Sequence, residues 1–312
     1  MNFTLVQLRY FVAAAELRSM TAASRELVVA QSAVSSAVAH LEREFKVQLL
    51  VRHHAKGLSL TPSGERFLSE ARELLAQAAD LAAGAQGLGG SLVGQLSVGC
   101  FVTLAPFVLP ALLSGFAERH PGVSVRLLED ETASLQAALL AGRCELALLY
   151  DLGLSDELEV ERLAQARPYA IVGAGHPLAA MGRVPLRLLA PEPMVLLDLP
   201  HSREYFAALV ALTGQEPTVA HRSTSFEMVR AMVAAGRGFA ILNQRPAHDL
   251  TYDGGRVAVL ELDSESAQEL PSLPVVLARA RSVRPTRRAE AFADACRGHF
   301  RDGPAFSGPG TP

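Results

Sequence analysis

Residues 21–45 read TAASRELVVAQSAVSSAVAHLEREF, two short helical stretches separated by a tight turn. In the second stretch apolar residues recur at i, i+4, i+7 and i+11, on one face of a helix: Val34, Val38, Leu41 and Phe45. The opposite face carries short side chains: Gln31, Ser32, Ser35, Ser36 and Ala39. Short side chains let a helix axis approach another molecule closely, whereas solvent-facing helices usually carry long charged residues. The pattern predicts a helix-turn-helix whose second helix lies in the major groove of DNA.

Helix-turn-helix patterns are short and degenerate, and this one also fits a Ser/Ala-rich helix in an ordinary bundle. The flanking sequence favours DNA binding. Residues 8–27 (LRYFVAAAELRSMTAASREL), 31–42 (QSAVSSAVAHLE) and 49–68 (LLVRHHAKGLSLTPSGERFL) resemble the DNA-binding domain of LysR-type transcriptional regulators. Residues 142–149 (GRCELALL) and 174–179 (AGHPLA) are similar to the effector domain of that family. The resemblance implies a regulator that binds double-stranded DNA and a small-molecule effector.

The chain departs from the family pattern at three positions around the second helix. The family usually has Ser or Thr where this chain has Ala30, often Pro where it has Ser32, and commonly Arg where it has Ser36. Ala30 has no side-chain oxygen that could accept a hydrogen bond from the first helical turn. We therefore expect this turn to be capped by Ser32 or to fray.

Residues 49–60 read as strand, turn and strand, which predicts a wing beside the second helix. A basic hairpin tip in this position would meet the DNA backbone or the minor groove. A solvated turn fits the adjacent His53 and His54 nearly as well, and metal binding lacks further ligands nearby. The predicted DNA contacts are Gln31, Ser32, Ser35, Ser36, His40, Arg52, His53 and Lys56.

Composition excludes several other classes of protein. A chain of 312 residues with 49% hydrophobic content is long enough for two or three domains with buried cores. We expect no membrane span, and Arg9 and Glu16 interrupt the region that a secretory signal would need. Three cysteines without a CxxC pair (Cys100, Cys144 and Cys296) indicate neither disulfides nor a zinc site. These features predict a cytoplasmic protein.

The net charge of −3 is divided unevenly along the chain. Residues 1–60 carry seven Lys or Arg and four Asp or Glu, so the first part is basic and the remainder acidic. Phosphate binding needs a local basic surface rather than a basic protein. The uneven distribution is therefore compatible with DNA binding by the first part.

Two further helices are expected around the helix-turn-helix. Thr4 and Gln7 have the spacing of a capping box, with Phe3 and Leu8 as its hydrophobic staple. Pro62 begins a helix of about 25 residues, roughly 37 Å long. Its apolar residues form a seam that could pair two chains: Leu68, Ala71, Leu75, Ala78 and Ala82. A core helix is the alternative, whereas the resemblance implies a dimerisation helix and two dimers forming a tetramer.

From residue 92 onward, short strands alternate with helices, an α/β pattern with a largely parallel sheet. The predicted strands are 95–98, 124–128, 145–149, 169–172, 194–197, 219–221, 239–242 and 274–278. A shift of pattern near Val160 and a later return to the first unit predict two lobes joined by a double crossover. The predicted class is α/β with an N-terminal winged helix-turn-helix and a two-lobed effector domain that resembles periplasmic binding proteins.

The predicted boundaries follow from these patterns. They are a winged helix-turn-helix (1–61), a linker helix and hinge (62–91), an effector domain (92–302) and a disordered tail (303–312). Within the effector domain, lobe I comprises 92–162 and 267–302, and lobe II comprises 163–266.

The alternative to a regulator is a ligand-binding or enzymatic α/β protein with an accessory helical domain. No GxSxG, GxxxxGK[ST], HExxH or GxGxxG motif lies in the required strand-turn-helix setting. Residues 129–131 (EDE) follow a strand but lack a His or Lys partner for acid/base chemistry. Cys100 could be a redox sensor, although an inert buried thiol is favoured because no cationic residue flanks it. We therefore predict no enzyme activity and no cofactor.

Effector contacts are expected at the carboxyl ends of the strands, where helix N-termini offer free N–H groups. Four such ends carry hydroxyl residues, each of which could instead be only a helix cap. The resemblance also points to Thr103, Thr132, Tyr150 and the turn 201–203. The predicted site contains Val102, Thr103, Thr132, Ser134, Tyr150, His201, Ser202, Arg203, Thr224 and Ser225. These hydroxyl groups, together with the cation of Arg203, would bind a negatively charged ligand. We therefore predict that the effector is a small organic anion, a carboxylate.

Overall fold

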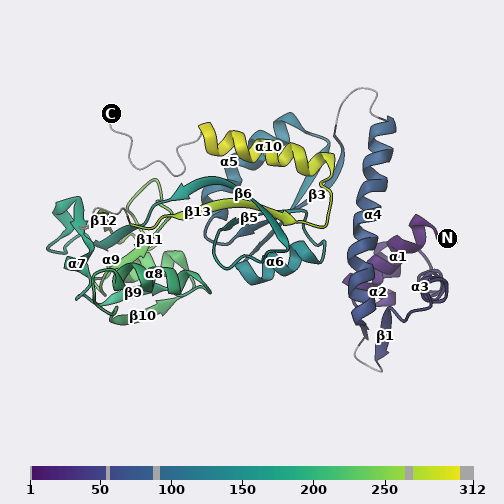
Figure 1. Ribbon diagram of the computed structural model, residues 1–312, viewed down its shortest axis with the longest axis horizontal. Coiled ribbons are helices and arrows are strands. Elements are labelled where there is room, and N and C mark those ends of the chain that lie inside the picture. Colours follow the sequence, from purple (N-terminus) through teal and green to yellow (C-terminus); the bar gives the residue numbers. More distant parts are fainter. Residues whose placement is uncertain (1, 54–56, 87–91, 264–269, 303–312) are drawn as a thin grey trace.

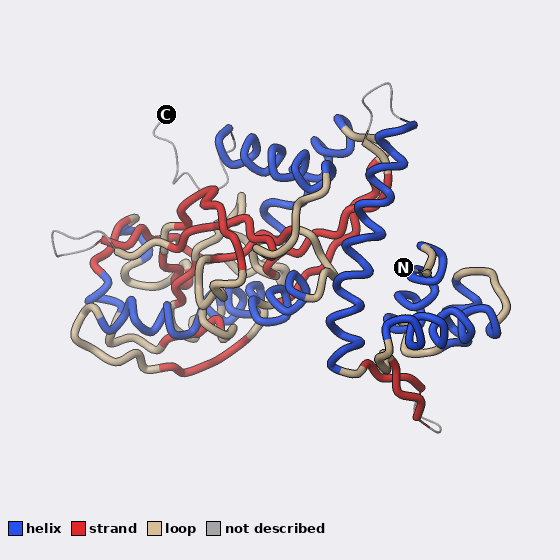
Figure 2. The backbone as a smooth tube through the Cα atoms, turned by 45° about the vertical axis from the view of Figure 1, so that its right-hand side comes forward, coloured by secondary structure: helices blue, strands red, loops and turns tan. Residues whose placement is uncertain are grey.

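The computed structural model describes residues 2–53, 57–86, 92–263 and 270–302. Three parts follow one another along its longest axis: a small helical domain with a hairpin, and two α/β lobes (Figure 1). The long helix α4 (Pro62–Gln86) runs between the helical domain and the nearer lobe (Figures 1 and 2). The predicted order of winged helix-turn-helix, long helix and two-lobed domain is thus present.

The first domain packs three helices and a two-stranded wing around one core. Its elements are α1 (Leu5–Glu16), α2 (Met20–Glu26), α3 (Gln31–Phe45), β1 (Leu50–His53) and β2 (Gly57–Leu60). The capping box predicted at Thr4 and Gln7 is present, because each side chain bonds to the backbone N–H of the other residue. The core includes Phe11, Val34 and Leu41, which are fully buried. The apolar face predicted for α3 is therefore the one that faces inward.

The helix α3 begins without a side-chain cap at Ala30, as expected from its missing oxygen. It ends at Lys46, which adopts a left-handed backbone conformation (φ 54°) and returns the chain toward the wing. The carboxylate of Glu42 then accepts hydrogen bonds from the backbone N–H groups of Leu49 (2.8 Å) and Leu50 (3.1 Å). One side chain of the recognition helix thus fixes where the wing begins.

The seam predicted on α4 is only partly available to a second chain. Leu68 and Ala71 are buried in the core of the first domain, and Leu75 packs against the same core. This part of the prediction is wrong because the helix uses these residues to hold its own winged domain. Among the described side chains of α4, Leu74 and Leu81 are the large apolar ones that remain exposed, Leu81 by 77%.

Lobe I is a five-stranded sheet of order β4-β3-β5-β13-β6. Its strands are β3 (Gly94–Phe101), β4 (Val123–Asp130), β5 (Leu146–Tyr150), β6 (Leu158–Ala166) and β13 (Leu273–Ala280). The helices α5 (Ala105–Arg119) and α10 (Arg287–Asp302) cover one face, and α6 (Thr132–Leu140) covers the other (Figure 1). Only β13 runs antiparallel to its neighbours β5 and β6, so the expectation of a largely parallel sheet holds here.

Lobe II contains a sheet of order β11-β7-β12-β8 and the parallel pair β9 and β10. Its strands are β7 (Tyr169–Gly173), β8 (Arg183–Pro185), β9 (Met194–Leu197), β10 (Val219–Ser223), β11 (Ala240–Leu242) and β12 (Val257–Asp263). Its helices are η1 (Ala179–Met181), α7 (Leu186–Leu189), α8 (Ser202–Ala211) and α9 (Phe226–Ala234). The pairing in this lobe is mixed, because β7 pairs antiparallel with β11 and β12, whereas β12 pairs parallel with β8.

Two strands connect the lobes. The strand β6 pairs with β13 from Leu158 to Ala166, so lobe I continues four residues beyond the predicted boundary at 162. The chain enters lobe II after Ala166 and returns to lobe I at Leu273. The predicted double crossover is present. The predicted tail, 303–312, lies outside the described residues.

Candidate DNA-binding surface and effector site

The predicted groove-facing side of α3 is open to solvent. Gln31, Ser32 and Ser36 are exposed. Ser35 is half-buried because its hydroxyl accepts a hydrogen bond of 2.8 Å from Nη2 of the wing residue Arg52. This bond joins the recognition helix to the wing, which sequence reasoning did not anticipate. The bond sets the position of the Arg52 guanidinium relative to the exposed face of α3.

The histidines of this surface have different surroundings. His53 is exposed on the wing and forms a hydrogen bond of 2.8 Å with the hydroxyl of Ser59 on the opposite strand. His40 is half-buried, and its Nε2–H donates to the carbonyl oxygen of Asn2 at 2.6 Å. This contact gives His40 a role in fixing the N-terminal segment. The remaining predicted contact, Lys56, lies outside the described residues.

Three of the predicted effector residues are buried hydroxyls at the ends of strands in both lobes. Thr103 follows β3, Thr132 begins α6 after β4, and Ser202 begins α8 after β9; each is at most 6% exposed. Because Val102 N donates to Asp130 O (3.1 Å) beyond the last paired residues of β3 and β4, Thr103 and Thr132 lie at neighbouring strand ends.

Tyr150, the last residue of β5, lies beside Thr103 at the same edge of the sheet. Burial raises the pKa of Tyr150 well above its usual value, and the nearby hydroxyl of Thr103 opposes that rise. The Tyr150 hydroxyl nevertheless has no hydrogen-bond partner of normal geometry among the described residues. A buried hydroxyl is costly to leave unpaired, and the hydroxyl of Thr103 is the nearest group that could pair with it.

Contacts on two sides of this region join the lobes. The ring of Phe107 at the start of α5 meets that of Phe226 at the start of α9, with centroids 5.6 Å apart. The ring of His201 packs on Gly153, where an added Cβ would lie 2.8 Å from a ring atom. His201 itself has a positive φ of 63°, a strained backbone conformation for this residue. The two contacts hold the strand ends of both lobes together.

Sequence reasoning missed a polar cluster at the connection between the lobes. Asn243 donates to the carbonyl of Ala166 (3.1 Å) and to the hydroxyl of Tyr205 (3.3 Å). That hydroxyl donates in turn to the carbonyl of Pro271 (2.7 Å), and burial raises the pKa of Tyr205 to about 12. The two carbonyl groups lie at the ends of the strands that connect the lobes, Ala166 at the end of β6 and Pro271 just before β13. No short motif marks these residues, because their partners are distant in sequence.

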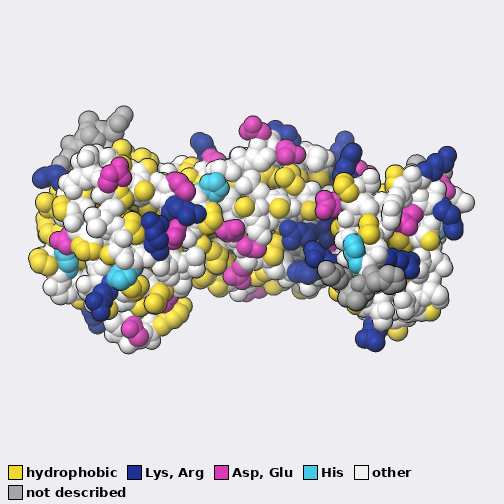
Figure 3. Space-filling model, turned by 90° about the horizontal axis from the view of Figure 1, so that it is seen from below, with side chains coloured by type: hydrophobic (Ala, Val, Ile, Leu, Met, Phe, Trp, Pro, Cys, Tyr) yellow, Lys and Arg dark blue, Asp and Glu magenta, His cyan; other side chains and the backbone are white. Residues whose placement is uncertain are grey.

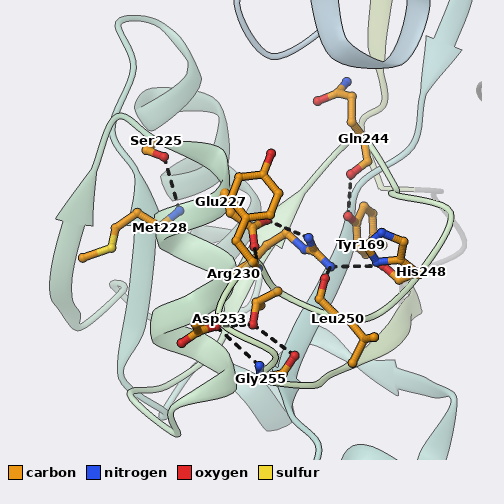
Figure 4. A network of polar contacts seen from close by, with 12 residues as sticks. Tyr169, Ser225, Glu227, Met228, Arg230, Gln244, His248, Leu250, Asp253 and Gly255 are labelled. Atoms are coloured by element: carbon orange, nitrogen blue, oxygen red, sulfur yellow. Dashed lines mark hydrogen bonds and ion pairs between the residues drawn. The ribbon is translucent and has the colours of Figure 1, made fainter.

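The other predicted effector residues lie outside the buried group. Thr224 and Ser225 are exposed, and Ser225 caps α9 by accepting from the backbone N–H of Met228 (Figure 4). Ser134 donates to the carboxylate of Asp130 at 2.5 Å. Val102 is exposed on the adjoining turn.

Arg203, the predicted cation, already has carboxylate neighbours. It lies 3.4 Å from Oδ1 of Asp198, and Arg222 lies 3.5 Å from Oδ2 of the same residue. The guanidinium of Arg203 is therefore partly neutralised and half-exposed.

Arg230, unlike Arg203, is a buried cation with a structural role. Arg230 of α9 is 3% exposed and contacts the carboxylate of Glu227 (2.7 Å) and the carbonyls of His248 and Leu250 (Figure 4). Glu227 also accepts from the backbone N–H of Tyr252 (2.6 Å). Together they fix the 248–252 loop against α9.

The three cysteines are buried thiols. Burial raises the pKa of Cys144 to about 11 and raises the pKa values of Cys100 and Cys296 further. All three are therefore protonated at neutral pH. Among the described residues, no three His, Cys, Asp or Glu side chains are grouped so as to hold a metal ion. None of the described helices has both the length and the apolar character needed to cross a bilayer.

A winged helix-turn-helix joined by a long helix to two hinged α/β lobes defines a class of ligand-responsive DNA-binding regulators. Two family models match the chain: "Bacterial regulatory helix-turn-helix protein, lysR family" over residues 5–65 and "LysR substrate binding domain" over residues 89–301. The chain belongs to the LysR family and is a DNA-binding transcriptional regulator, not an enzyme.

Several relatives cover most of the chain. The "Probable hydrogen peroxide-inducible genes activator" of Mycobacterium avium is 32% identical over 77% of this chain and 78% of its own length. The crystal structure of HinK, a LysR family regulator from Pseudomonas aeruginosa, is 39% identical, covers 96% of this chain and 99% of its own, and has a TM-score of 0.64. Full-length OxyR from Pseudomonas aeruginosa is 26% identical, with coverages of 95% and 98% and a TM-score of 0.75.

Proposed function

We propose that this regulator responds to a small organic carboxylate bound between its lobes. The buried hydroxyls of Thr103, Thr132 and Ser202, together with the unpartnered hydroxyl of Tyr150, carry this proposal. Binding would change the arrangement of lobes or subunits without any chemical step.

The helix N-termini around these residues support an anionic ligand. The helices α5, α6 and α8 have no side-chain hydrogen bond at their N-caps, whereas α9 is capped by Ser225. An uncapped N-terminus leaves backbone N–H groups and the positive end of the helix dipole free for an anion. A carboxylate would accept from these groups and from the hydroxyls.

A calorimetric or thermal-shift screen of carboxylates tests the ligand. Wild type is compared with the double variant Thr103→Val, Ser202→Ala, and with Thr218→Val as a control on an exposed hydroxyl of lobe II outside the predicted site. We expect the double variant to lose the thermal shift and the control to keep it. A ligand whose affinity and effect on DNA binding survive the double change would bind elsewhere.

Hydrogen peroxide is a second candidate stimulus, because two relatives are described as activators of hydrogen peroxide-inducible genes. The buried, protonated thiols of Cys100, Cys144 and Cys296 argue against a thiol-based response, because the thiolate is the reactive form. We expect peroxide to leave both thiol mass and promoter binding unchanged. Oxidation of any of the three at a stoichiometric dose, with altered DNA binding, would favour this candidate instead.

Retardation of a labelled fragment of the protein's own promoter region, measured at several salt concentrations, tests the DNA target. A salt-sensitive shift is expected, because phosphate contacts release counterions. We further propose a homodimer or homotetramer, supported by the exposed Leu74 and Leu81 of α4. Sedimentation of Leu81→Glu should show weakened association, and Ala79→Glu, at an exposed position on another face of the same helix, serves as the matched control.

A further inference from the structure

The winged domain is attached to lobe I through Arg72 of α4. Its guanidinium contacts Oε1 of Glu16 on α1 through Nε (3.0 Å) and Nη2 (2.7 Å). Nη1 of the same group donates to the carbonyl of Ala141 in lobe I at 2.7 Å. The side chain of Arg72 is only 13% exposed, whereas that of Glu16 is 41% exposed. One side chain therefore joins the DNA-binding domain, the long helix and the effector domain.

The lobe I side of this contact is the C-terminal end of α6. The hydroxyl of Ser69, one turn before Arg72, donates to the carbonyl of Leu140 at 3.3 Å. Gly142 packs on the same turn of α4, where an added Cβ would lie 3.5 Å from the Ser69 hydroxyl. The last carbonyls of a helix carry negative partial charge and lack partners within the helix. A cation and a hydroxyl from α4 satisfy them here.

The other contacts of α6 lead to lobe II. The side chain of Gln136 donates to the carbonyl of Gly153 (3.2 Å) and accepts from the backbone N–H of Ser155 (2.7 Å). Gly153 is the residue on which the His201 ring of lobe II packs. The helix also sits closely on β3, because a Cβ at Gly99 would lie 2.9 Å from the side chain of Leu135. Such close packing makes α6 and the sheet of lobe I move together as one body.

We propose that Arg72 positions the winged domain on lobe I and that α6 transmits changes at the lobe contact to it. The connected contacts run from His201 through Gly153 and Gln136 along α6 to Arg72 and Glu16. The regulatory meaning of this connection rests on the proposed function. Its structural part is independent of it, because the contacts of Arg72 and Gln136 are made between residues of this chain. A change in the packing of the lobes would move the end of α6 and thereby reorient the winged domain. Basic side chains gather on lobe I beside the winged domain, so reorientation would also change which charges face the DNA (Figure 3).

Spin-label distance measurements on the full chain test the role of Arg72. Labels are attached at Val28→Cys in the winged domain, which is 88% exposed, and at Glu118→Cys on α5. The native cysteines are buried and would not react. Dilution with unlabelled protein limits the signal to pairs within one chain. Arg66, which is exposed on the same helix, provides the matched control Arg66→Ala.

The expected result is one narrow distance peak in wild type and in Arg66→Ala. Arg72→Ala should lose that peak and give a broad distribution shifted to longer distances. Glu16→Ala should give part of the same change, and combining it with Arg72→Ala should add little. A retained narrow peak in Arg72→Ala would overturn the proposal, as would equal broadening in Arg66→Ala. Neither DNA nor effector is present, so failure of the proposed function would be seen separately in the promoter and ligand experiments.

Hydrogen exchange tests the role of α6. Gly153→Ala would place a Cβ against the His201 ring, in a backbone conformation (φ +62°) that already disfavours it. We expect faster exchange in α4 around residues 69–76 than in wild type. Gly182→Ala is the matched control, because Gly182 also has a positive φ (+68°) but no neighbouring atom within 4 Å of the added Cβ. Unchanged exchange in α4 of Gly153→Ala, or an equal change in the control, would overturn transmission through α6.

Discussion

The helix α3 and the proposed effector site present their polar groups in opposite ways. Gln31, Ser32 and Ser36 are exposed on α3, above a core that includes fully buried Val34. Thr103 and Ser202 lie buried at strand ends in two different lobes. A surface that receives a large partner can keep its polar groups hydrated until binding. A site for a small ligand must enclose it, and therefore removes its own polar groups from water beforehand.

This difference has an energetic consequence. The polar groups on α3 stay hydrated when no DNA is bound, so they carry no desolvation penalty. A buried hydroxyl without a hydrogen-bond partner lowers the stability of the folded protein by about 1 to 3 kcal/mol. The Tyr150 hydroxyl is in that position, as is the buried side-chain oxygen of Asn243, which has no partner in the described part of the chain. Substitutions at the DNA surface should therefore change binding with little effect on stability. Substitutions at the effector site should change both.

The largest expected effect is the loss of stability of one domain while the other domain stays folded. Phe11 is fully buried in the core of the winged domain and packs edge-on against Phe67, with centroids 5.2 Å apart. Phe11→Ala should destabilise that domain by about 3 to 5 kcal/mol, because it removes apolar burial and leaves a cavity. We expect DNA binding to be lost while the thermal transition of the effector domain is retained. Phe292→Ala, in the separate core of lobe I, should show the reverse in a calorimetric scan. A single shared transition that moves equally in both variants would contradict independent cores.

The next effect concerns base readout. Gln31→Ala or Ser35→Ala should weaken operator binding by about 1 to 3 kcal/mol and leave random DNA unaffected. Arg52→Ala should weaken both and reduce the salt dependence. Because Arg52 bonds to Ser35, the effects of these two substitutions should not be additive. Equal losses on operator and random DNA for Gln31→Ala, in a retardation titration, would remove α3 from base readout.

The corresponding change at the effector site should stabilise the free protein. Tyr150→Phe removes a buried hydroxyl that has no partner, so the unfolding free energy should rise by about 1 kcal/mol or more. Tyr205→Phe is the matched control, because its hydroxyl bonds to Pro271 and Asn243 and its loss should destabilise. Denaturant titration without ligand measures both. A loss of stability in Tyr150→Phe equal to that in Tyr205→Phe would mean that the Tyr150 hydroxyl is already paired.

The sequence predicted features that depend on neighbouring residues. The capping box at Thr4, the apolar face of α3 and the strand at Met194–Leu197 are each encoded within a few positions. The strands β6, β8 and β12 were not predicted, because their mixture of buried, half-buried and exposed positions gives a weak periodic signal.

Features that depend on distant partners could not be predicted in this way. Leu68 looks the same on a dimer seam as on the winged core, and only the fold decides between them. The contacts of Arg72 with Ala141, and of Asn243 with Ala166, join residues about 70 positions apart. Nothing in the local pattern distinguishes these side chains from other polar ones. The strand ends were predictable as a group, whereas the burial of Thr132 and the exposure of Thr224 were not.

The smallest expected effect is that of a polar pair that is only half-buried. Glu161 on β6 accepts from Arg297 on α10 at both oxygens, through Nε (2.7 Å) and Nη2 (2.9 Å). This hydrogen bonding lowers the pKa of Glu161 in the folded protein below its ordinary value of 4.5. A carboxyl with a lowered folded pKa stabilises the protein above its unfolded pKa, and this stabilisation is lost as the pH falls through the folded pKa.

Glu161→Gln should therefore lower the unfolding free energy at pH 7 by about 1 kcal/mol or less, because water screens exposed pairs. The difference between variant and wild type should shrink as the pH falls below 4.5, where wild-type Glu161 itself takes up a proton. Thermal unfolding of both proteins at pH 7 and at about pH 4 measures this difference. Glu159→Gln is a useful comparison, because Glu159 has a single contact with Arg279 on the neighbouring strand β13. A difference that grows toward acid pH would mean that Glu161 is stabilised in its protonated form. The pair would then belong with the buried polar groups of the effector site rather than with the hydrated groups of the DNA surface.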